Sequence, residues 1–181
     1  MLNKFLLIVF FSIALVSGCT DGREKYIRRI IGSELFISEE LMTKVDGNES
    51  HLSELDKELR IVVFSDSSNC NACDIRFPLW KIKYKELNLL YGDIGLIYII
   101  NTSDIADMEL NANIVNAAGL RLYDTKGIFS KNNQVFNQRE FNVFLIDRDN
   151  KIILVGNPLE NHKLYALYKR AIEEYTKNEK N

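Results

Sequence analysis

The stretch Ile61-Val62-Val63-Phe64, followed after a short polar loop by Cys70-Asn71-Ala72-Cys73, decides how this chain is interpreted. The four apolar residues are typical of a strand buried on both faces of a sheet. Apolar positions at helical spacing continue to Tyr91 and predict a helix from about Cys70 to Tyr91, with Pro78 five residues after the second cysteine. Two cysteines, separated by two residues, therefore stand at the expected start of a helix.

This helix carries two apolar rows, which predict that it packs against more than one neighbour. The rows are Ile75, Leu79 and Ile82, and Trp80, Tyr84, Leu87 and Tyr91.

Further elements follow in an order that defines the fold class. A second buried strand is expected at 96–100, a helix at 104–118 and a short strand at 120–123, whereas residues 129–139 are polar and loop-like. A hairpin of strands 141–147 and 152–156 turns at 148–151 and precedes a last helix. The sequence thus predicts an α/β fold, in which a βαβ unit precedes a β-hairpin and a closing helix, with helices flanking a mixed sheet. The core stripe of the last helix is Leu164, Leu167, Tyr168, Ala171, Ile172 and Tyr175.

The paired cysteines have the spacing for thiol–disulfide exchange. Residues three apart on a helix are neighbours, so that Cys70 and Cys73 can close a disulfide after a small tightening. Unpaired backbone N–H groups at a helix start lower the pKa of a thiol, which favours Cys70 as the attacking thiolate and Cys73 as the resolving thiol. Asn71 and Ala72 bring no charge, while Asp74 and Arg76 act in opposite directions and leave the sign of their effect open.

The N-terminus has the anatomy of an export signal. A short basic start and an apolar run precede small residues at 17–18, and the run is shorter than the about 20 residues that span a membrane. Val16-Ser17-Gly18-Cys19 resembles the lipobox of bacterial lipoproteins, which implies cleavage before Cys19 and lipid on that cysteine. The alternative is an ordinary signal that leaves a cysteine at the new terminus. The expected organisation is a signal peptide at 1–18, a tether and N-terminal addition at 19–58, and one α/β domain at 59–181.

Composition narrows the class of partner. The formal net charge is −2 and no basic patch stands out, which argues against nucleic acid and against electrostatic membrane docking. The chain has three cysteines. With Cys19 assigned to lipid, the pair at 70 and 73 remains, and an oxidising compartment favours a disulfide between them.

Together, the strand 61–64, Cys70-Asn71-Ala72-Cys73, Pro78 and Trp80 resemble the thioredoxin superfamily, and the later hairpin is similar to its TlpA-like branch. The resemblance implies a thiol–disulfide oxidoreductase with Cys70 as nucleophile and Cys73 as resolving thiol. It also implies reduction or isomerisation of exported proteins, a membrane thiol reductase as electron donor, and no small-molecule cofactor. The expected location is the bacterial cell envelope, with the domain lipid-anchored in the periplasm.

Three positions depart from the pattern of that superfamily. Its members usually have a cis-proline before the first hairpin strand, whereas residues 139–143 contain no proline, which favours trans peptide bonds there. Asn69 stands where many members have tryptophan. Arg76 stands where TlpA-like members often have glutamate, and Asp66 is a weak substitute for that carboxylate.

Two other functions remain open at this stage. A thioredoxin-fold adaptor could use the cysteine pair as a structural disulfide alone. Copper delivery could recruit Met108, His51 or His162, although a single CxxC supplies only two soft ligands and neither histidine has metal-ligand spacing. No metal site is predicted.

Overall fold

The structure is a computed structural model that describes residues 22–42, 49–66, 75–133 and 141–178. The chain forms two units, Met1–Ile30 and Ile31–Asn181. In the first unit the described element is helix α2 (Gly22–Ile30), and all the elements discussed below belong to the second. Among the described helices, none is both long and apolar enough to span a membrane.

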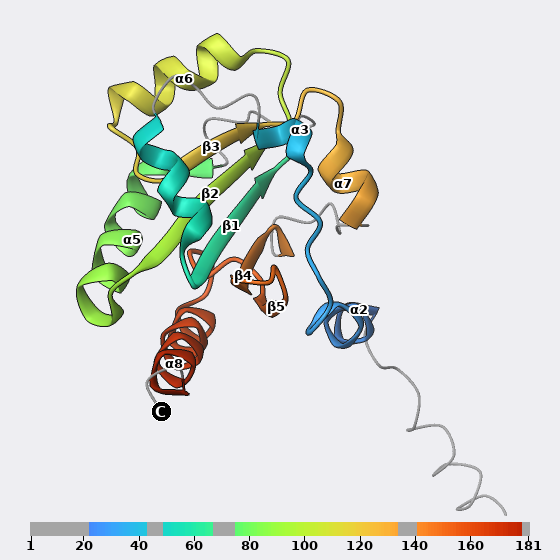
Figure 1. Cartoon of the computed structure of the whole chain (residues 1–181), viewed down its shortest axis with the longest axis vertical. Coiled ribbons are helices and arrows are strands. Elements are labelled where there is room, and N and C mark those ends of the chain that lie inside the picture. Colours follow the sequence, from blue (N-terminus) through green and yellow to red (C-terminus); the bar gives the residue numbers. More distant parts are fainter. Residues whose placement is uncertain (1–21, 43–48, 67–74, 134–140, 179–181) are drawn as a thin grey trace, which may run out of the picture. The chain divides into compact units, whose positions relative to one another are not determined.

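A five-stranded mixed sheet with the order β3-β2-β1-β4-β5 is the centre of the second unit (Figure 1). β1 pairs in parallel with β2, and β2 with β3, whereas β4 is antiparallel to both β1 and β5. The parallel unit followed by a hairpin is therefore confirmed. The strands are β1 (Leu59–Ser65), β2 (Ile94–Ile100), β3 (Leu120–Tyr123), β4 (Val143–Asp147) and β5 (Ile152–Val155).

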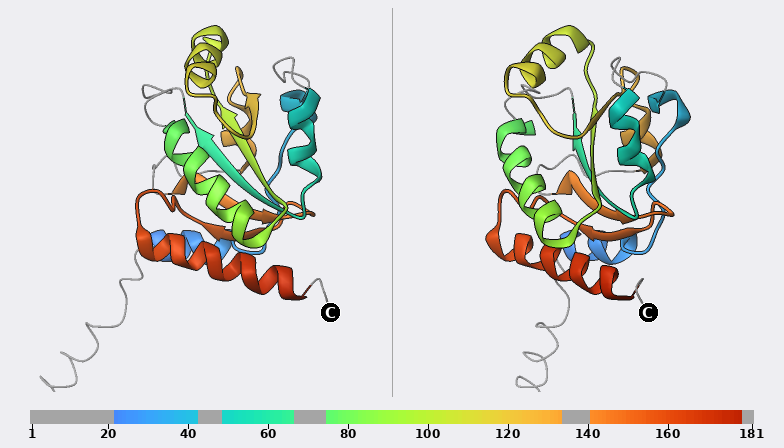
Figure 2. Two further views of the ribbon diagram at one scale, coloured as in Figure 1. Left: turned by 90° about the vertical axis from the view of Figure 1, so that its left-hand side faces the viewer. Right: turned by 60° about the vertical axis from the view of Figure 1, so that its left-hand side comes forward.

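Helices cover both faces of this sheet. One face packs against α5 (Phe77–Tyr91), α6 (Ile105–Ile114) and α8 (His162–Asn178), and α5 and α8 lie side by side (Figure 2). On the other face, Phe129 of α7 (Ile128–Asn133) contacts aromatic rings of β1 and β4. β1 and β2 are buried along their whole length because they are covered on both sides, as their continuous apolar runs predict.

The N-terminal part of the second unit pairs with the edge of the sheet. Backbone hydrogen bonds join Gly32 and Ser33 to Ile152, and Leu35 to Asn150, over 2.8–2.9 Å. This pairing occupies the backbone groups of Ile152 at the start of the β5 edge, which would otherwise be available to a strand of another chain. The short helix α3 (Glu39–Met42) and the 3-10 helix η1 (Glu49–Asp56) then lead into β1.

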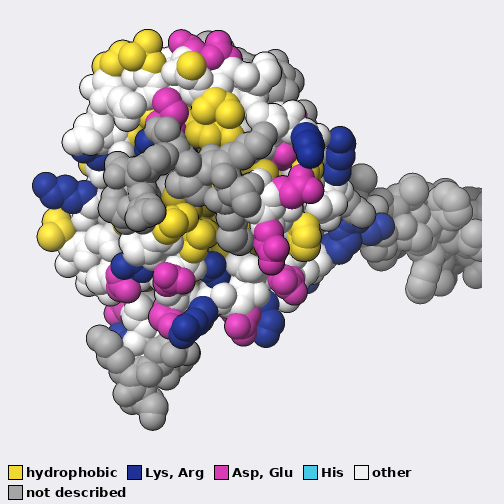
Figure 3. Space-filling view, turned by 45° about the horizontal axis from the view of Figure 1, so that its top comes forward, with side chains coloured by type: hydrophobic (Ala, Val, Ile, Leu, Met, Phe, Trp, Pro, Cys, Tyr) yellow, Lys and Arg dark blue, Asp and Glu magenta, His cyan; other side chains and the backbone are white. Residues whose placement is uncertain are grey.

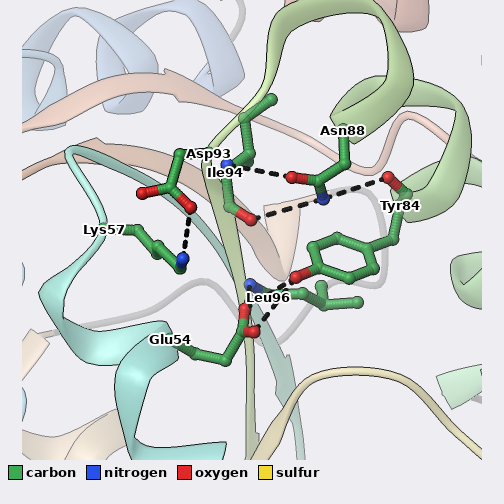
Figure 4. Close-up of polar contacts among 7 residues, drawn as sticks. All are labelled: Glu54, Lys57, Tyr84, Asn88, Asp93, Ile94 and Leu96. Carbon is green, nitrogen blue, oxygen red and sulfur yellow. Dashed lines mark hydrogen bonds and ion pairs between the residues drawn. The ribbon is translucent and has the colours of Figure 1, made fainter.

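A polar cluster joins η1, α5 and β2 at the amino end of the sheet (Figure 4). The Glu54 carboxylate accepts a hydrogen bond from the backbone N–H of Leu96 over 2.8 Å and from the hydroxyl of Tyr84 over 3.0 Å. Leu96 precedes the first β2 residue that pairs with β3, so that Glu54 satisfies a backbone donor that β3 does not reach. Burial, reinforced by the Glu54 carboxylate, raises the pKa of Tyr84 above its usual range.

The close approach of η1 to β2 requires a glycine. A Cβ atom placed on Gly95 would lie 2.5 Å from the carbonyl oxygen of Glu54 and 2.9 Å from Cγ of Arg60. Any larger residue at position 95 would therefore push η1 away from the sheet.

The predicted helix from about Cys70 to Tyr91 is not continuous. Arg76 has a left-handed backbone (φ 55°, ψ 49°) and α5 begins after it, at Phe77. A left-handed residue cannot continue a right-handed helix, and Pro78 fits the first turn of α5, where its missing N–H is not needed. The positive end of the α5 dipole therefore lies at Phe77, and the expected helix start at Cys70 falls outside the described residues.

Three predicted core positions are in fact exposed. Leu79 and Ile82 of the first apolar row of α5 are 45% and 61% exposed, and Leu167 of α8 is also exposed. The second row of α5 is the one that packs on the sheet, with Trp80 and Leu87 fully buried. The spacing alone could not distinguish the two rows, because both recur at helical intervals.

Two loop boundaries also differ from the prediction. Residues 129–133, expected to be loop-like, belong to α7 (Ile128–Asn133), and the helix expected at 104–118 ends at Ile114. The Asp124 side chain explains the first difference, because it accepts hydrogen bonds from the backbone N–H groups of Ile128 and Phe129 over 2.9 and 2.8 Å and so caps α7.

Candidate functional site

The candidate redox segment connects β1 to α5. β1 ends at Ser65 and α5 begins at Phe77, so that residues 67–74 leave the sheet at the carboxyl end of its central strand. The expected site residues Cys70, Asn71, Ala72, Cys73 and Asp74 lie outside the described residues, as does Cys19, and their roles stay predictions. The described residues around this segment are Asp66 on one side and Ile75, Arg76 and Pro78 on the other.

The strand directions place several loops at the end of the sheet from which this segment starts, that is, at the carboxyl end of β1. Val63 near the end of β1 pairs with Val143 at the start of β4, and Phe144 pairs with Val155 at the end of β5. The connections at 101–104, 141–142 and 156–161 therefore share one edge with the β1–α5 connection. Figure 3 shows the side to which the β1 and β2 arrows point in Figure 1, where hydrophobic side chains gather in several groups and acidic and basic side chains mix.

Asn142 ties the start of β4 to the end of β1. Its carbonyl oxygen accepts the backbone N–H of Phe64 over 2.8 Å, and its side-chain Nδ2 donates to the Phe64 carbonyl over 2.9 Å. Asn142 directly precedes β4 and belongs to residues 139–143, the stretch without the usual proline, and the described part of the chain contains no cis peptide bond. An amide side chain here makes contacts with β1 that a proline could not make.

Asn157 extends this contact into the β5–α8 connection. Its buried side chain approaches Asn142, with 3.5 Å between Nδ2 of Asn157 and Oδ1 of Asn142, and its Oδ1 accepts the backbone N–H of Leu159 over 3.0 Å. The hydroxyl of Tyr168 in α8 donates to the Gly156 carbonyl over 3.0 Å and so binds the same connection to α8. Polar side chains thus join the carboxyl ends of β1 and β5 to the start of β4.

Arg76 makes the second link between the candidate segment and the β5–α8 connection. Its Nη2 lies 2.9 Å from Oε1 of Glu160, and both side chains are about one-third exposed. The sequence prediction considered Arg76 only for its effect on the cysteines and missed Glu160. No local signal could have found this carboxylate, because the two residues are distant in sequence and meet only in the folded chain.

Asp66 is held at the end of β1. Its Oδ1 accepts a hydrogen bond from Nδ2 of Asn101 over 3.2 Å, and the side chain is half-buried. Asp66 is the last described residue before the candidate segment and its carboxylate is already hydrogen-bonded, so that its part as a weak substitute for the missing glutamate stays a prediction.

Of the donors considered for copper, the structure describes the side chains of Met108 and His162, whereas Cys70, Cys73 and the side chain of His51 lie outside the described residues. No group of three or more His, Cys, Asp and Glu side chains suited to a metal ion occurs there. Met108 of α6 is buried in the core, and His162 is exposed at the start of α8. Trp80 is a core residue, as predicted.

Comparisons by sequence and by structure gave different results. A scan against protein-family models found no match. A search of curated proteins also found no similar sequence.

Solved structures, in contrast, share the fold. A candidate thiol:disulfide interchange protein DsbE from Chlorobium tepidum is 21% identical over 67% of this chain and 84% of its own, with a TM-score of 0.51. A candidate protein disulfide isomerase from Bacteroides thetaiotaomicron is 21% identical over 70% of this chain and 78% of its own, with a TM-score of 0.50. The thioredoxin domain of a thiol-disulfide oxidoreductase from Bacteroides vulgatus is 11% identical over 67% and 84%, with a TM-score of 0.51. At these identities the likeness concerns the fold alone, and this chain has the mixed α/β sheet with flanking helices of the thioredoxin-like fold.

Proposed function

We propose that this protein carries out thiol–disulfide exchange through Cys70 and Cys73. The observation that carries the proposal is the place of the CxxC sequence, which occupies the connection from the central strand β1 to α5 in a thioredoxin-like sheet. Two thiols at this spacing can form and break one disulfide without another cysteine. No small-molecule cofactor is required, because the pair itself carries two electrons.

The reaction follows from the chemistry of the pair. The Cys70 thiolate attacks one sulfur of a substrate disulfide, forms a mixed disulfide and releases the other substrate sulfur as a thiolate. The Cys73 thiolate then attacks Sγ of Cys70, closes the Cys70–Cys73 disulfide and releases the second substrate thiolate, and both take up protons from water. The substrate gains two electrons and the pair loses two, which an external dithiol, such as a membrane thiol reductase, returns. Isomerisation needs no net electrons, because the mixed disulfide is resolved by a thiol of the substrate.

The proposed location is the bacterial cell envelope. The signal-like residues 1–18 and the lipobox-like sequence ending at Cys19 support export and lipid attachment, and several acyl chains hold a protein at a membrane far better than one. The proposed substrates are then exported proteins with thiols or disulfides. Incorporation of radiolabelled palmitate by the native chain in a bacterial host, and its loss in Cys19→Ser, would support the anchor, whereas equal labelling of both proteins would contradict it.

Trapping of mixed disulfides tests the exchange reaction. In Cys73→Ser the mixed disulfide at Cys70 cannot be resolved by the chain itself, so that substrates should accumulate as adducts on non-reducing gels. The Cys70→Ser/Cys73→Ser protein is the control and should trap none. The reduction potential of the Cys70–Cys73 couple, measured against glutathione, then separates a reductant from an oxidant.

A thioredoxin-fold adaptor without redox activity is the second candidate function. Asn142 favours it, because its side chain is already hydrogen-bonded to β1 in the stretch before β4 where the superfamily usually has a cis-proline that faces the CxxC. If Cys70 resists alkylation near neutral pH and Cys73→Ser traps nothing, the adaptor replaces the exchange proposal.

A further inference from the structure

We propose that a groove between α5 and the start of α8 binds a large apolar side chain, with an acidic residue beside it, of the polypeptide that exchanges disulfides at Cys70 and Cys73. This inference rests on the proposed function and adds a specificity site to it. The groove is lined by Leu79, Ile82, Lys83, Pro158, Leu159, His162 and Tyr165.

The size of the groove suits a side chain. Its volume is about 220 Å³, whereas pockets for small molecules and cofactors usually measure about 300–1,000 Å³. One large apolar side chain fits this space better than a complete cofactor does.

The groove contains apolar side chains that the fold leaves exposed to solvent. Leu79 and Ile82 are three residues apart on α5 and share one face of the helix, and they are 45% and 61% exposed. Pro158 and Leu159 form the opposite wall in the β5–α8 connection. Covering such a pair of side chains removes apolar area from water and so favours binding.

The groove begins on the helix that follows the candidate redox segment in sequence. Leu79 follows Arg76 by three residues, and Leu159 precedes Glu160, so that the Arg76–Glu160 ion pair lies at the end of the groove toward the start of α5. Ile82 lies about 9 Å further along the helix axis than Arg76 at the usual rise per residue. A polypeptide bound by its cysteine can therefore reach the groove with a residue a few positions away.

Charge at the far end of the groove specifies the partner further. The ammonium of Lys83 lies 4.1 Å from the ring centroid of Tyr165, and that of Lys169 lies 5.2 Å from the same ring. Both ammonium groups approach one carboxylate, that of Glu86, at 3.2 and 3.9 Å. Two cations share one anion there, so that an acidic residue of the partner complements the rim.

Exchange kinetics with synthetic peptides test the proposal. Each peptide carries one cysteine as a mixed disulfide with thionitrobenzoate, followed by a spacer of about two to five alanines, since an extended residue spans about 3.3 Å, and then by Leu-Glu. A second series ends in Ser-Lys. The reduced protein is oxidised to its disulfide, the peptide and thionitrobenzoate leave as thiols, and the coloured thionitrobenzoate reports the rate.

We expect the native chain to react about tenfold faster with the best Leu-Glu peptide than with its Ser-Lys counterpart. Ile82→Ser should abolish most of this preference and Lys83→Gln part of it. Leu89→Ser and Lys85→Gln, on exposed parts of α5 outside the groove, are the matched controls and should leave it unchanged. All variants should react alike with free bis(hydroxyethyl) disulfide, which is uncharged and carries neither a large apolar group nor a carboxylate.

The outcomes separate the two proposals. If the native chain consumes no disulfide, even the small one, the exchange function fails and the docking site fails with it. If the small disulfide reacts but no spacer gives a Leu-Glu preference, or if Leu89→Ser removes the preference as fully as Ile82→Ser does, the docking proposal alone is overturned. A dimer in sedimentation that Ile82→Ser dissociates would show that a second copy of the chain occupies the groove, and would also overturn it.

Discussion

The guanidinium of Arg76 pairs with the carboxylate of Glu160 over 2.9 Å, and this contact joins the residue before α5 to the connection before α8. Arg76 makes the contact from a left-handed backbone, which non-glycine residues rarely adopt. At Arg76, the free-energy cost of the left-handed backbone therefore opposes the stabilisation by the ion pair.

Substitutions of Arg76 can separate these terms. Arg76→Gln keeps the backbone cost and loses the pair, so that the free energy of unfolding should fall by about 0.5 kcal/mol, as for partly exposed pairs. Arg76→Gly also loses the pair but relieves about 1 kcal/mol of backbone cost, and should leave the chain about 0.5 kcal/mol more stable than the native one. Urea unfolding measures both variants. A glycine variant less stable than the glutamine variant would show that the left-handed backbone is not strained.

Asn142 should stabilise the edge of the sheet that holds the candidate site. Asn142→Ala removes the hydrogen bond to the Phe64 carbonyl and its contact with Asn157, and should lower the free energy of unfolding by about 1–2 kcal/mol. Asn132→Ala, at an exposed position in α7, is the control and should change stability by less than about 0.5 kcal/mol. Equal effects in urea unfolding would argue against the link between β1 and β4.

A buried ion pair holds α6 on β3. The Arg121 guanidinium donates to both carboxylate oxygens of Glu109 over 2.7 and 2.9 Å, each side chain is 10% exposed, and the hydroxyl of Tyr123 donates to the same carboxylate. Although burial lowers the pKa of Arg121, the hydrogen bond and charge of Glu109 outweigh it and raise that pKa. Glu109→Gln should cost about 3 kcal/mol because it leaves a buried cation without its anion.

The double variant Glu109→Gln/Arg121→Met tests whether the cost comes from the unpaired charge. Removing both charges should restore most of the lost stability, since a buried pair and an apolar replacement differ little. Urea is the denaturant of choice because it is uncharged and leaves the ionic strength of the solution unchanged. A double variant no more stable than Glu109→Gln would show that the pair is needed for packing rather than for charge compensation.

Buried tyrosines should make the fold sensitive to alkaline pH. Burial raises the pKa of Tyr98, Tyr123 and Tyr168 above the ordinary value of about 10. Above that ordinary value the unfolded chain releases these protons while the folded chain keeps them, so that the unfolded state binds fewer protons and stability falls as pH rises. Stability from these groups is fully present below about pH 10, and each contributes a loss of about 1.4 kcal/mol per pH unit above it.

Tyr168→Phe provides the check on this slope. The variant loses the hydrogen bond to Gly156 and should be about 1 kcal/mol less stable at pH 8, but its stability should fall less steeply above pH 10. Urea unfolding between about pH 8 and 11 measures both quantities. An unchanged slope would mean that lysines rather than this tyrosine dominate the alkaline loss.

Local sequence was sufficient to predict the order of the five strands and of α5, α6 and α8, although it missed α7. β1 and β2 are short apolar runs that only a doubly covered strand explains, and the hairpin turn between β4 and β5 is marked by four consecutive polar residues, Arg148 to Lys151. The CxxC sequence and its place after β1 were likewise readable from the chain. These features depend on neighbours in sequence, and their physical causes act over a few residues.

The tertiary structure decided which residues share a surface. Arg76 and Glu160, Asn142 and Phe64, and Glu54 and Leu96 meet across gaps that no periodicity spans. The same is true of α5, where two rows had equal helical spacing and only the position of the sheet and α8 left Leu79 and Ile82 exposed. Burial depends on what lies opposite a helix face, so that the sequence by itself could establish the helix and the fold class, whereas the groove and the ion pair beside the redox segment required the folded chain.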